Sequence, residues 1–252
     1  MRNLSAVTKR ILDKVEHQTG KNIQFFRDES LSVLATIHMA RNGAAFHVLR
    51  YRPSNEPIDY LIAYQAGFLL RLFDNEPAQR FDFSPHPGAS KHVELLLTAG
   101  QALNSQGRQA LFEVTKFVTH WALLNLRSLA IGMRIDRWIA TSYPELRELQ
   151  QSGLADQQQQ NMDVLAYKLG NLTVPTTLLG INAAYALFVD RLGGTESYAV
   201  PYEVNGLLTH GRELLRIWDE IPSDATHDCK LVDSWAAASG MTNWYNWIPY
   251  EP

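Results

Sequence analysis

Apolar residues recur every three or four positions at the start of the chain, at Leu4, Val7, Ile11, Leu12 and Val15. This spacing places them on one face of a helix. Gly20 follows them, and glycine is typical of a helix end because it adopts the left-handed backbone conformation found there. The pattern predicts an N-terminal helix that ends near Gly20.

Three short segments after this helix are rich in strand-forming residues: IQFFRD (23–28), LSVLATIHMA (31–40) and AAFHVLRY (44–51). The last two flank Asn42-Gly43, and Asn-Gly is a strong β-hairpin signal because both residues tolerate positive φ. A helix is expected next, from about Pro57 through Phe73, since proline suits a first helical turn.

The rest of the chain is predicted to be mostly helical. A proline-rich segment at 75–92 is interpreted as a loop that leads to a helix from about Ser90. Helical spacing then covers 93–103, 108–142, 144–154, 162–170, 176–192 and 204–221. The run at 108–142 exceeds a typical helix, and Gly132 is expected to interrupt it.

These elements predict an α+β fold that is mainly α-helical, with a small N-terminal antiparallel β-sheet. Residues 1–75 are expected to form an α/β lobe that ends in the helix at 58–73. Residues 76–252 are expected to form a helical region packed on that lobe and ending in an aromatic tail.

Composition narrows the class of protein. The 252 residues are 46% hydrophobic and 19% charged, which is enough to bury a sizeable core. A net charge of −3 argues against broad nucleic-acid binding. No apolar run reaches the roughly 18 residues that span a bilayer, and the N-terminus lacks the apolar core of a signal peptide. The single cysteine, Cys229, excludes an internal disulfide, so a cytoplasmic protein is expected.

The helix at 58–73 carries the most informative stretch, Leu61-Ile-Ala-Tyr-Gln-Ala-Gly-Phe-Leu-Leu70. It resembles the zinc-binding helix of zincin metallopeptidases, whose frame is L-I-A-H-E-x-G-H-L-L around the H-E-x-x-H motif. The order helix, small sheet, motif helix agrees with a zincin N-terminal lobe. The chain therefore resembles, in degenerate form, the zincin-like domains of IrrE-type bacterial regulatory peptidases; the alternative is an ordinary amphipathic helix.

The three positions that carry zincin chemistry are all replaced. Tyr64 and Phe68 stand where the two histidines would grip zinc, and Gln65 stands where the glutamate would act as general base. Phenylalanine binds no zinc, the tyrosine phenol stays protonated at neutral pH, and glutamine cannot accept a proton. The resemblance therefore implies a pseudo-peptidase that lacks the motif's metal and needs no cofactor.

A densely charged stretch, Arg134-Ile135-Asp136-Arg137-Trp138, lies in the predicted helical region. The favoured interpretation is an exposed, salt-bridged helix face, since charges three positions apart lie side by side. The alternative is that Asp136, Arg134 or Arg137 faces a cleft beneath the motif helix. The zincin resemblance implies an acidic third ligand on a later helix, for which Asp136 and Glu94 are both candidates.

Other clusters give weaker indications. A displaced metal site could use His86, His92, Glu94, His120 and Asp136. His38 and His47 lie on the two hairpin strands and are expected to be exposed. Cys229 has His227 nearby, but proximity in sequence does not make a catalytic pair.

The C-terminal residues hold half of the tryptophans, Trp235, Trp244 and Trp247, together with Tyr245 and Tyr250. Such rings must be buried. Docking of the tail onto its own domain is favoured, and a partner interface through Trp244 and Trp247 is the alternative.

Three functions remain open. The first is a non-catalytic, zincin-like protein that binds a protein partner or ligand, for example as a subunit of a bacterial stress or defence complex. The second is an active metal hydrolase with displaced ligands. The third is a helical scaffold unrelated to peptidases.

Overall fold

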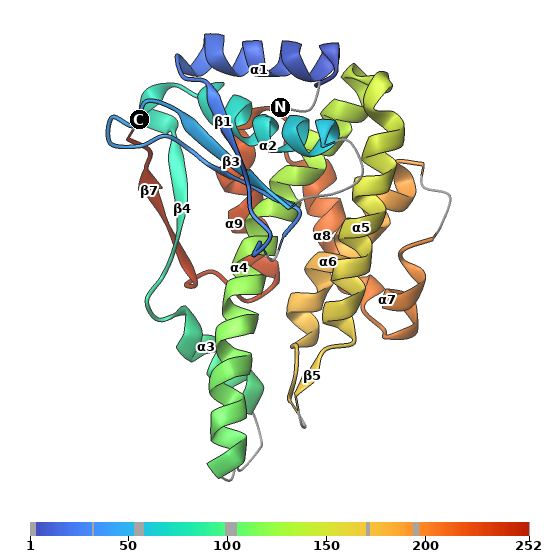
Figure 1. The fold of residues 1–252 in the computed structure, drawn as a ribbon. Coiled ribbons are helices and arrows are strands. Elements are labelled where there is room, and N and C mark those ends of the chain that lie inside the picture. The colour runs from blue at the N-terminus through green and yellow to red at the C-terminus, as the bar shows by residue number, and fades with distance from the viewer. Residues whose placement is uncertain are drawn as a thin grey trace.

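The computed structural model describes residues 4–31, 33–52, 58–98, 105–169, 172–193 and 197–251. Its elements run in the order α1 (Ala6–Thr19), β1 (Ile23–Arg27), β2 (Ala35–His38), β3 (His47–Tyr51), α2 (Asp59–Phe73), η1 (Pro77–Gln79), β4 (Phe81–Pro85), α3 (Ala89–Thr98), α4 (Ser105–Ser142), η2 (Pro144–Leu146), α5 (Arg147–Leu165), β5 (Lys168–Leu169), β6 (Leu172–Thr173), α6 (Thr176–Arg191), α7 (Val200–Val204), α8 (Leu208–Glu220), η3 (Ala225–His227), α9 (Asp228–Ala238) and β7 (Tyr245–Pro249). The fold is mainly α-helical α+β, as predicted (Figure 1).

The first helix begins after a serine cap and ends at the predicted glycine. The Ser5 side chain accepts a hydrogen bond from the Thr8 backbone N–H at 3.1 Å, and Gly20 takes the left-handed conformation with φ of 71°. Val7, Ile11 and Val15 are buried. The helix therefore covers α2 with its apolar face, as Figure 1 shows at the top of the molecule.

The N-terminal sheet has the strand order β1-β3-β2. β2 and β3 form the predicted antiparallel hairpin, and Asn42 and Gly43 adopt positive φ in its turn, at 50° and 78°. β1 pairs with the other edge of β3 in parallel, so the pairing of the whole sheet is mixed. Because β3 is central, β2 is left at the edge of the sheet.

The second helix, α2, joins the sheet to the rest of the molecule. Ile58 and Ile62 pack with Leu49 of β3 on one side. On the other side, Ala66, Leu69 and other residues belong to a core that extends from α1 to the C-terminal strand. The motif helix therefore has core on two sides, as its apolar sequence indicates.

The segment at 75–92 and the C-terminal tail contain two strands that the sequence did not reveal. β4 (Phe81–Pro85) pairs antiparallel with β7 (Tyr245–Pro249), with Phe83 opposite Trp247. The two strands stand together at the left of Figure 1 although they are far apart in the sequence. The loop prediction was therefore wrong for 81–85, and the tail docks onto its own chain, as favoured.

The longest helix, α4, runs without interruption for 38 residues. The prediction that Gly132 breaks it was wrong. A Cβ at Gly132 would overlap the hydroxyl group of Tyr64, so this glycine permits the close approach of α2 to α4. The N-terminal half of α4 projects from the body beside α3, while its C-terminal half lies at the centre (Figure 1).

Candidate functional site

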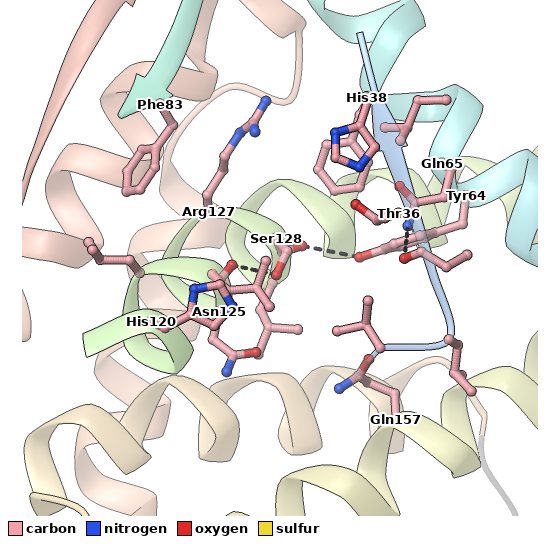
Figure 2. A pocket seen from close by; sticks show the side chains of 18 of the residues that line it. Thr36, His38, Tyr64, Gln65, Phe83, His120, Asn125, Arg127, Ser128 and Gln157 are labelled. Carbon is pink, nitrogen blue, oxygen red and sulfur yellow. Dashed lines mark hydrogen bonds between the residues drawn. The ribbon is translucent and has the colours of Figure 1, made fainter. Parts of the chain in front are cut away.

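A cavity of about 830 Å³ lies between the edge strand β2, α2 and α4. β4 and α5 complete its wall. Its volume falls within the range of roughly 300–1,000 Å³ that is usual for ligand sites. Figure 2 shows side chains from these elements pointing into one space, with β2 and α2 on one side and α4 on the other. This cavity is the candidate functional site.

The three replaced motif positions of α2 all line this cavity. The rings of Tyr64 and Phe68 meet edge to face at 5.4 Å between centroids. The Tyr64 hydroxyl donates to the Ser128 carbonyl of α4 at 3.1 Å, and the Gln65 side-chain amide donates to the Ala35 carbonyl of β2 at 3.0 Å. The side chains at 64 and 68 thus lie together, as we expect for residues at i and i+4 of a helix, and Gln65 reaches the same cavity from the adjacent position.

The Tyr64 phenol stays neutral in this position. Burial, and next the charge of Asp136, raise its pKa well above 10. A protonated phenol is a poor metal ligand. Tyr64 therefore acts as a hydrogen-bond donor in the cavity wall.

The edge of β2 that faces away from β3, with which no strand pairs in the described part of the chain, forms another wall. The Arg52 backbone N–H donates to the Leu34 carbonyl at 2.9 Å, so the peptide group of Leu34 faces β3. Because backbone groups alternate along a strand, those of Ala35 and Ile37 point away from β3. The bond from Gln65 to the Ala35 carbonyl confirms this orientation at one of the two residues.

Charged side chains gather at one end of the cavity. Asp82 of β4 is buried and forms ion pairs with Arg41, which follows β2, and with Arg127 of α4, the latter at 3.7 Å. Lys116 of α4 adds a third cationic side chain to the wall, eleven residues before Arg127 and therefore about 16 Å from it along the helix axis. These four residues were missed in the sequence. Two signals were present: Arg127 is an isolated cation in the apolar run at 122–132, and the alternation in Phe81-Asp82-Phe83-Ser84 is typical of a strand.

Asp136 lies behind the cavity and not in it. Its carboxylate is fully buried and accepts hydrogen bonds from Tyr60 at 2.8 Å, Gln150 at 3.2 Å and Tyr185 at 3.4 Å. Burial raises its pKa to about 7 against the lowering effect of these hydrogen bonds. Because Tyr60 and Tyr185 line the cavity, Asp136 supports its wall through them.

The two arginines around Asp136 lie elsewhere. Arg134 is buried and bonds to Asp228 at 2.8 Å, and Arg71 of α2 reaches the same carboxylate at 2.7 Å. We call these three residues the sealed network. Arg137 is exposed and stacks on the Trp218 ring at 4.5 Å. The interpretation of this stretch as an exposed salt-bridged face was wrong for Arg134 and Asp136, because both side chains face the protein interior.

The two tail tryptophans are held by the body of the chain. Trp244 is 2% exposed. The Trp247 indole N–H donates to Asp233 of α9 at 2.8 Å, and its ring meets Phe83 edge to face at 5.5 Å. Phe83 in turn lines the cavity. The tail thus supports the cavity through β4 and does not itself line it.

The structure does not bring the displaced metal-ligand candidates together. His120 lines the cavity, His86, His92 and Glu94 are exposed around the start of α3, and Asp136 is buried. Among the described residues, no group of three or more His, Cys, Asp or Glu side chains is placed to hold a metal ion. The candidates therefore lack the convergence that a metal site requires.

The remaining reactive side chains have structural surroundings. His38 is exposed in the cavity wall, as expected, but His47 is buried, with Nδ1 accepting from the Ala40 N–H at 2.9 Å. Burial, with a smaller contribution from Lys21, lowers the pKa of His47 to about 4, so the ring is neutral. Burial raises the pKa of Cys229 to about 11, so its thiol is a weak nucleophile.

In the part of the chain that the structure describes, no helix has the length and apolar character needed to cross a membrane. Comparison of the chain with protein-family models, with curated proteins and with solved structures gives no match.

Proposed function

We propose that the protein is a non-catalytic, zincin-like binding protein that holds a segment of a partner protein in the cavity between β2 and α2. One observation carries this proposal: Tyr64, Gln65 and Phe68 converge on a cavity that also has a free strand edge in its wall. A strand edge binds extended peptides through backbone hydrogen bonds, and a neighbouring cavity accepts their side chains.

The arrangement of the elements supports the zincin part of the proposal. The resemblance implies a motif helix packed under a small sheet, and here Ile58 and Ile62 at the start of α2 pack against Leu49 of β3. Gln65 then links the middle of α2 to the edge strand through Ala35. The helix and the edge strand therefore enclose the same space from two sides.

The side chains support binding without cleavage. The Gln65 amide has no basic oxygen that could activate water, and the Tyr64 phenol is neutral. The rings of Tyr64 and Phe68 make the α2 side of the cavity wall apolar. Such a wall favours binding of a peptide segment rather than its hydrolysis.

The test is a selection of random peptides from a displayed library on the purified chain. We expect enriched peptides to bind the wild-type protein and to lose at least tenfold in affinity for Thr36→Trp, which fills the cavity from β2. Amide exchange at Ile37 should slow when such a peptide binds, because the peptide covers the free edge of β2.

The matched control is Thr173→Trp on β6, a strand threonine that is exposed and outside the cavity. This variant should keep wild-type affinity. If no peptide is enriched, or if enriched peptides bind Thr36→Trp as tightly as wild type, the proposal is overturned.

A further inference from the structure

The cavity wall carries an excess of positive charge. Among the described residues that line it are three cationic side chains, Arg41, Lys116 and Arg127, and one carboxylate, Asp82. The whole chain has a net charge of −3, so the cavity differs in sign from the molecule. A site of this kind attracts an anionic group.

Arg127 has the greatest unused capacity for hydrogen bonding in this wall. Among the described residues its guanidinium has an ion pair of 3.7 Å with Asp82 and no hydrogen bond. The same carboxylate is held more closely by Arg41 and by the Phe83 N–H at 2.8 Å. Arg127 thus retains most of the five N–H donors that a guanidinium offers.

The position of Arg127 suits contact with a ligand. Its side chain is half-buried, and Figure 2 shows it extending from α4 between Phe83 and His38 of β2. Burial, and next the charge of Arg41, lower its pKa to about 10, so it is still charged at neutral pH. A carboxylate placed here would offset both the burial and the repulsion by Arg41.

The backbone groups at the edge of β2 determine which conformation of ligand can bind there. Ile37 points its backbone N–H and carbonyl away from β3, and in the described part of the chain no strand pairs with that edge. The Gln65 side-chain N–H group donates to the Ala35 carbonyl on the same edge, so a ligand cannot use that carbonyl freely. The side-chain oxygen of Gln65 can accept a hydrogen bond from the ligand instead. An extended peptide can therefore add to the sheet beside the cationic end of the cavity.

We propose that the occupant of the cavity is an extended peptide segment with an acidic side chain, whose backbone pairs with β2 at Ile37 and whose carboxylate binds Arg127. This inference rests on the proposed function and gives it a ligand class. The acidic group is assigned to a side chain because protein sites for a C-terminal carboxylate use nests of backbone N–H groups, whereas the donor here is a side-chain fork.

The experiment uses two pools of fluorescent hexapeptides with blocked ends, N-acetylated and C-amidated. One position is fixed as Glu in the first pool and as Gln in the second, and the others are drawn from Val, Ile, Leu and Thr. We expect the Glu pool to bind wild-type protein at least tenfold more tightly than the Gln pool, because charged hydrogen bonds exceed neutral ones.

Three variants assign the effect. In Arg127→Gln the preference for the Glu pool should fall below about threefold. In Arg137→Gln, an exposed arginine of the same helix outside the cavity, the preference should be unchanged. In Arg127→Lys, which keeps the charge and loses the fork, it should be intermediate. If Arg127→Gln does not fold, the preference for the Glu pool is compared between wild type and Arg127→Lys instead.

The outcomes separate this inference from the proposed function. If the two pools bind equally and Thr36→Trp blocks both, the acidic ligand is wrong and the binding function stands. If neither pool binds, the acidic ligand is again overturned, and the binding function depends on the random library alone. If a single-stranded oligonucleotide displaces the Glu pool and itself requires Arg127, the peptide assignment is overturned in favour of nucleic acid.

Discussion

Arg127 and Arg134 lie seven residues apart on α4, and therefore on nearly the same face of the helix, but in regions with opposite properties. Arg134 makes four hydrogen bonds, to Asp228 and to the carbonyls of residues 221, 222 and 224. Among the described residues, Arg127 has one long ion pair, to Asp82. Charge in the sealed network joins segments of the fold, whereas the charge of Arg127 borders the cavity.

The same contrast appears along α2. Ala66 and Leu70 are four residues apart and buried away from the cavity, while Tyr64 and Phe68, also four apart, line the cavity, where Tyr64 is half-buried and Phe68 also packs into the core. One face of the helix is thus fixed by packing and the other has space beside it. This difference predicts where substitutions will be costly and where they will be tolerated.

The largest expected difference is between Arg134→Met and Arg127→Met. Loss of Arg134 leaves the buried Asp228 with Arg71 alone and three carbonyls without their donor, so we expect a destabilisation of about 3–5 kcal/mol. Loss of Arg127 leaves Asp82 paired with Arg41, so the cost should be about 1 kcal/mol or less. Urea unfolding measures both. Equal losses would show that Arg127 has a structural role and would break the comparison.

The buried Asp136 gives the second effect, through pH. Burial raises its folded-state pKa from 3.8 to about 7. Between about pH 4 and 7 the unfolded chain therefore releases a proton that the folded chain keeps, and stability falls as pH rises, by up to about 4 kcal/mol. Asp136→Asn stays neutral, so it should gain stability relative to wild type across this window.

Denaturation at pH 5, 6, 7 and 8 tests this difference. The control is Asp163→Asn, an exposed aspartate of α5, which should follow the wild-type pH dependence. A constant difference between Asp136→Asn and wild type at every pH would contradict the raised pKa.

Two glycines offer a third and smaller comparison. A Cβ at Gly67 would overlap the buried Ile135, whereas a Cβ at Gly132 would overlap the Tyr64 hydroxyl, which borders the cavity and has room to move. We expect Gly67→Ala to cost about 1–3 kcal/mol. Gly132→Ala should cost about 1 kcal/mol or less, since the loss of the bond to Ser128 is offset by better helix propensity. Urea unfolding that ranks the two variants in the reverse order would argue against free space beside Tyr64.

The sequence predicted those parts of the fold that depend on local signals. The hairpin at Asn42-Gly43 and the C-terminal end of α1 at Gly20 follow from backbone preferences of single residues. The position of Tyr64 and Phe68 on one face follows from helix geometry. Local patterns were sufficient because each of these features lies within one element or one turn.

Apart from the short strands β5 and β6, where the helical prediction at 162–170 was wrong beyond Leu165, the features that were missed depend on long-range contacts. β4 needs β7, which is more than 150 residues away, and prolines near β4 favoured a loop. Gly132 has the composition of a helix break, but its role is set by Tyr64 of another helix. Asp82, Arg41 and Arg127 meet from three separate segments, so no spacing in the sequence could reveal the cationic end of the cavity.

The smallest expected effect tests the zincin resemblance itself. The triple variant Tyr64→His, Gln65→Glu, Phe68→His places two imidazoles at i and i+4 beside the cavity. Because both positions line the cavity, the new side chains have space beside them, and the protein should still fold. Zinc at 1 mM should then stabilise it by about 1 kcal/mol, a rise in melting temperature of roughly 2–4 °C. The double variant Tyr64→His, Phe68→Leu has one imidazole and should show no zinc effect.

The same histidine spacing on the side of α2 away from the cavity, Ala66→His with Leu70→His, buries both rings without partners and should prevent folding. A triple variant that folds without a response to zinc would contradict the proposed metallopeptidase ancestry of the cavity. A variant that fails to fold would show that the core contacts of Phe68 outweigh the space beside it in the cavity.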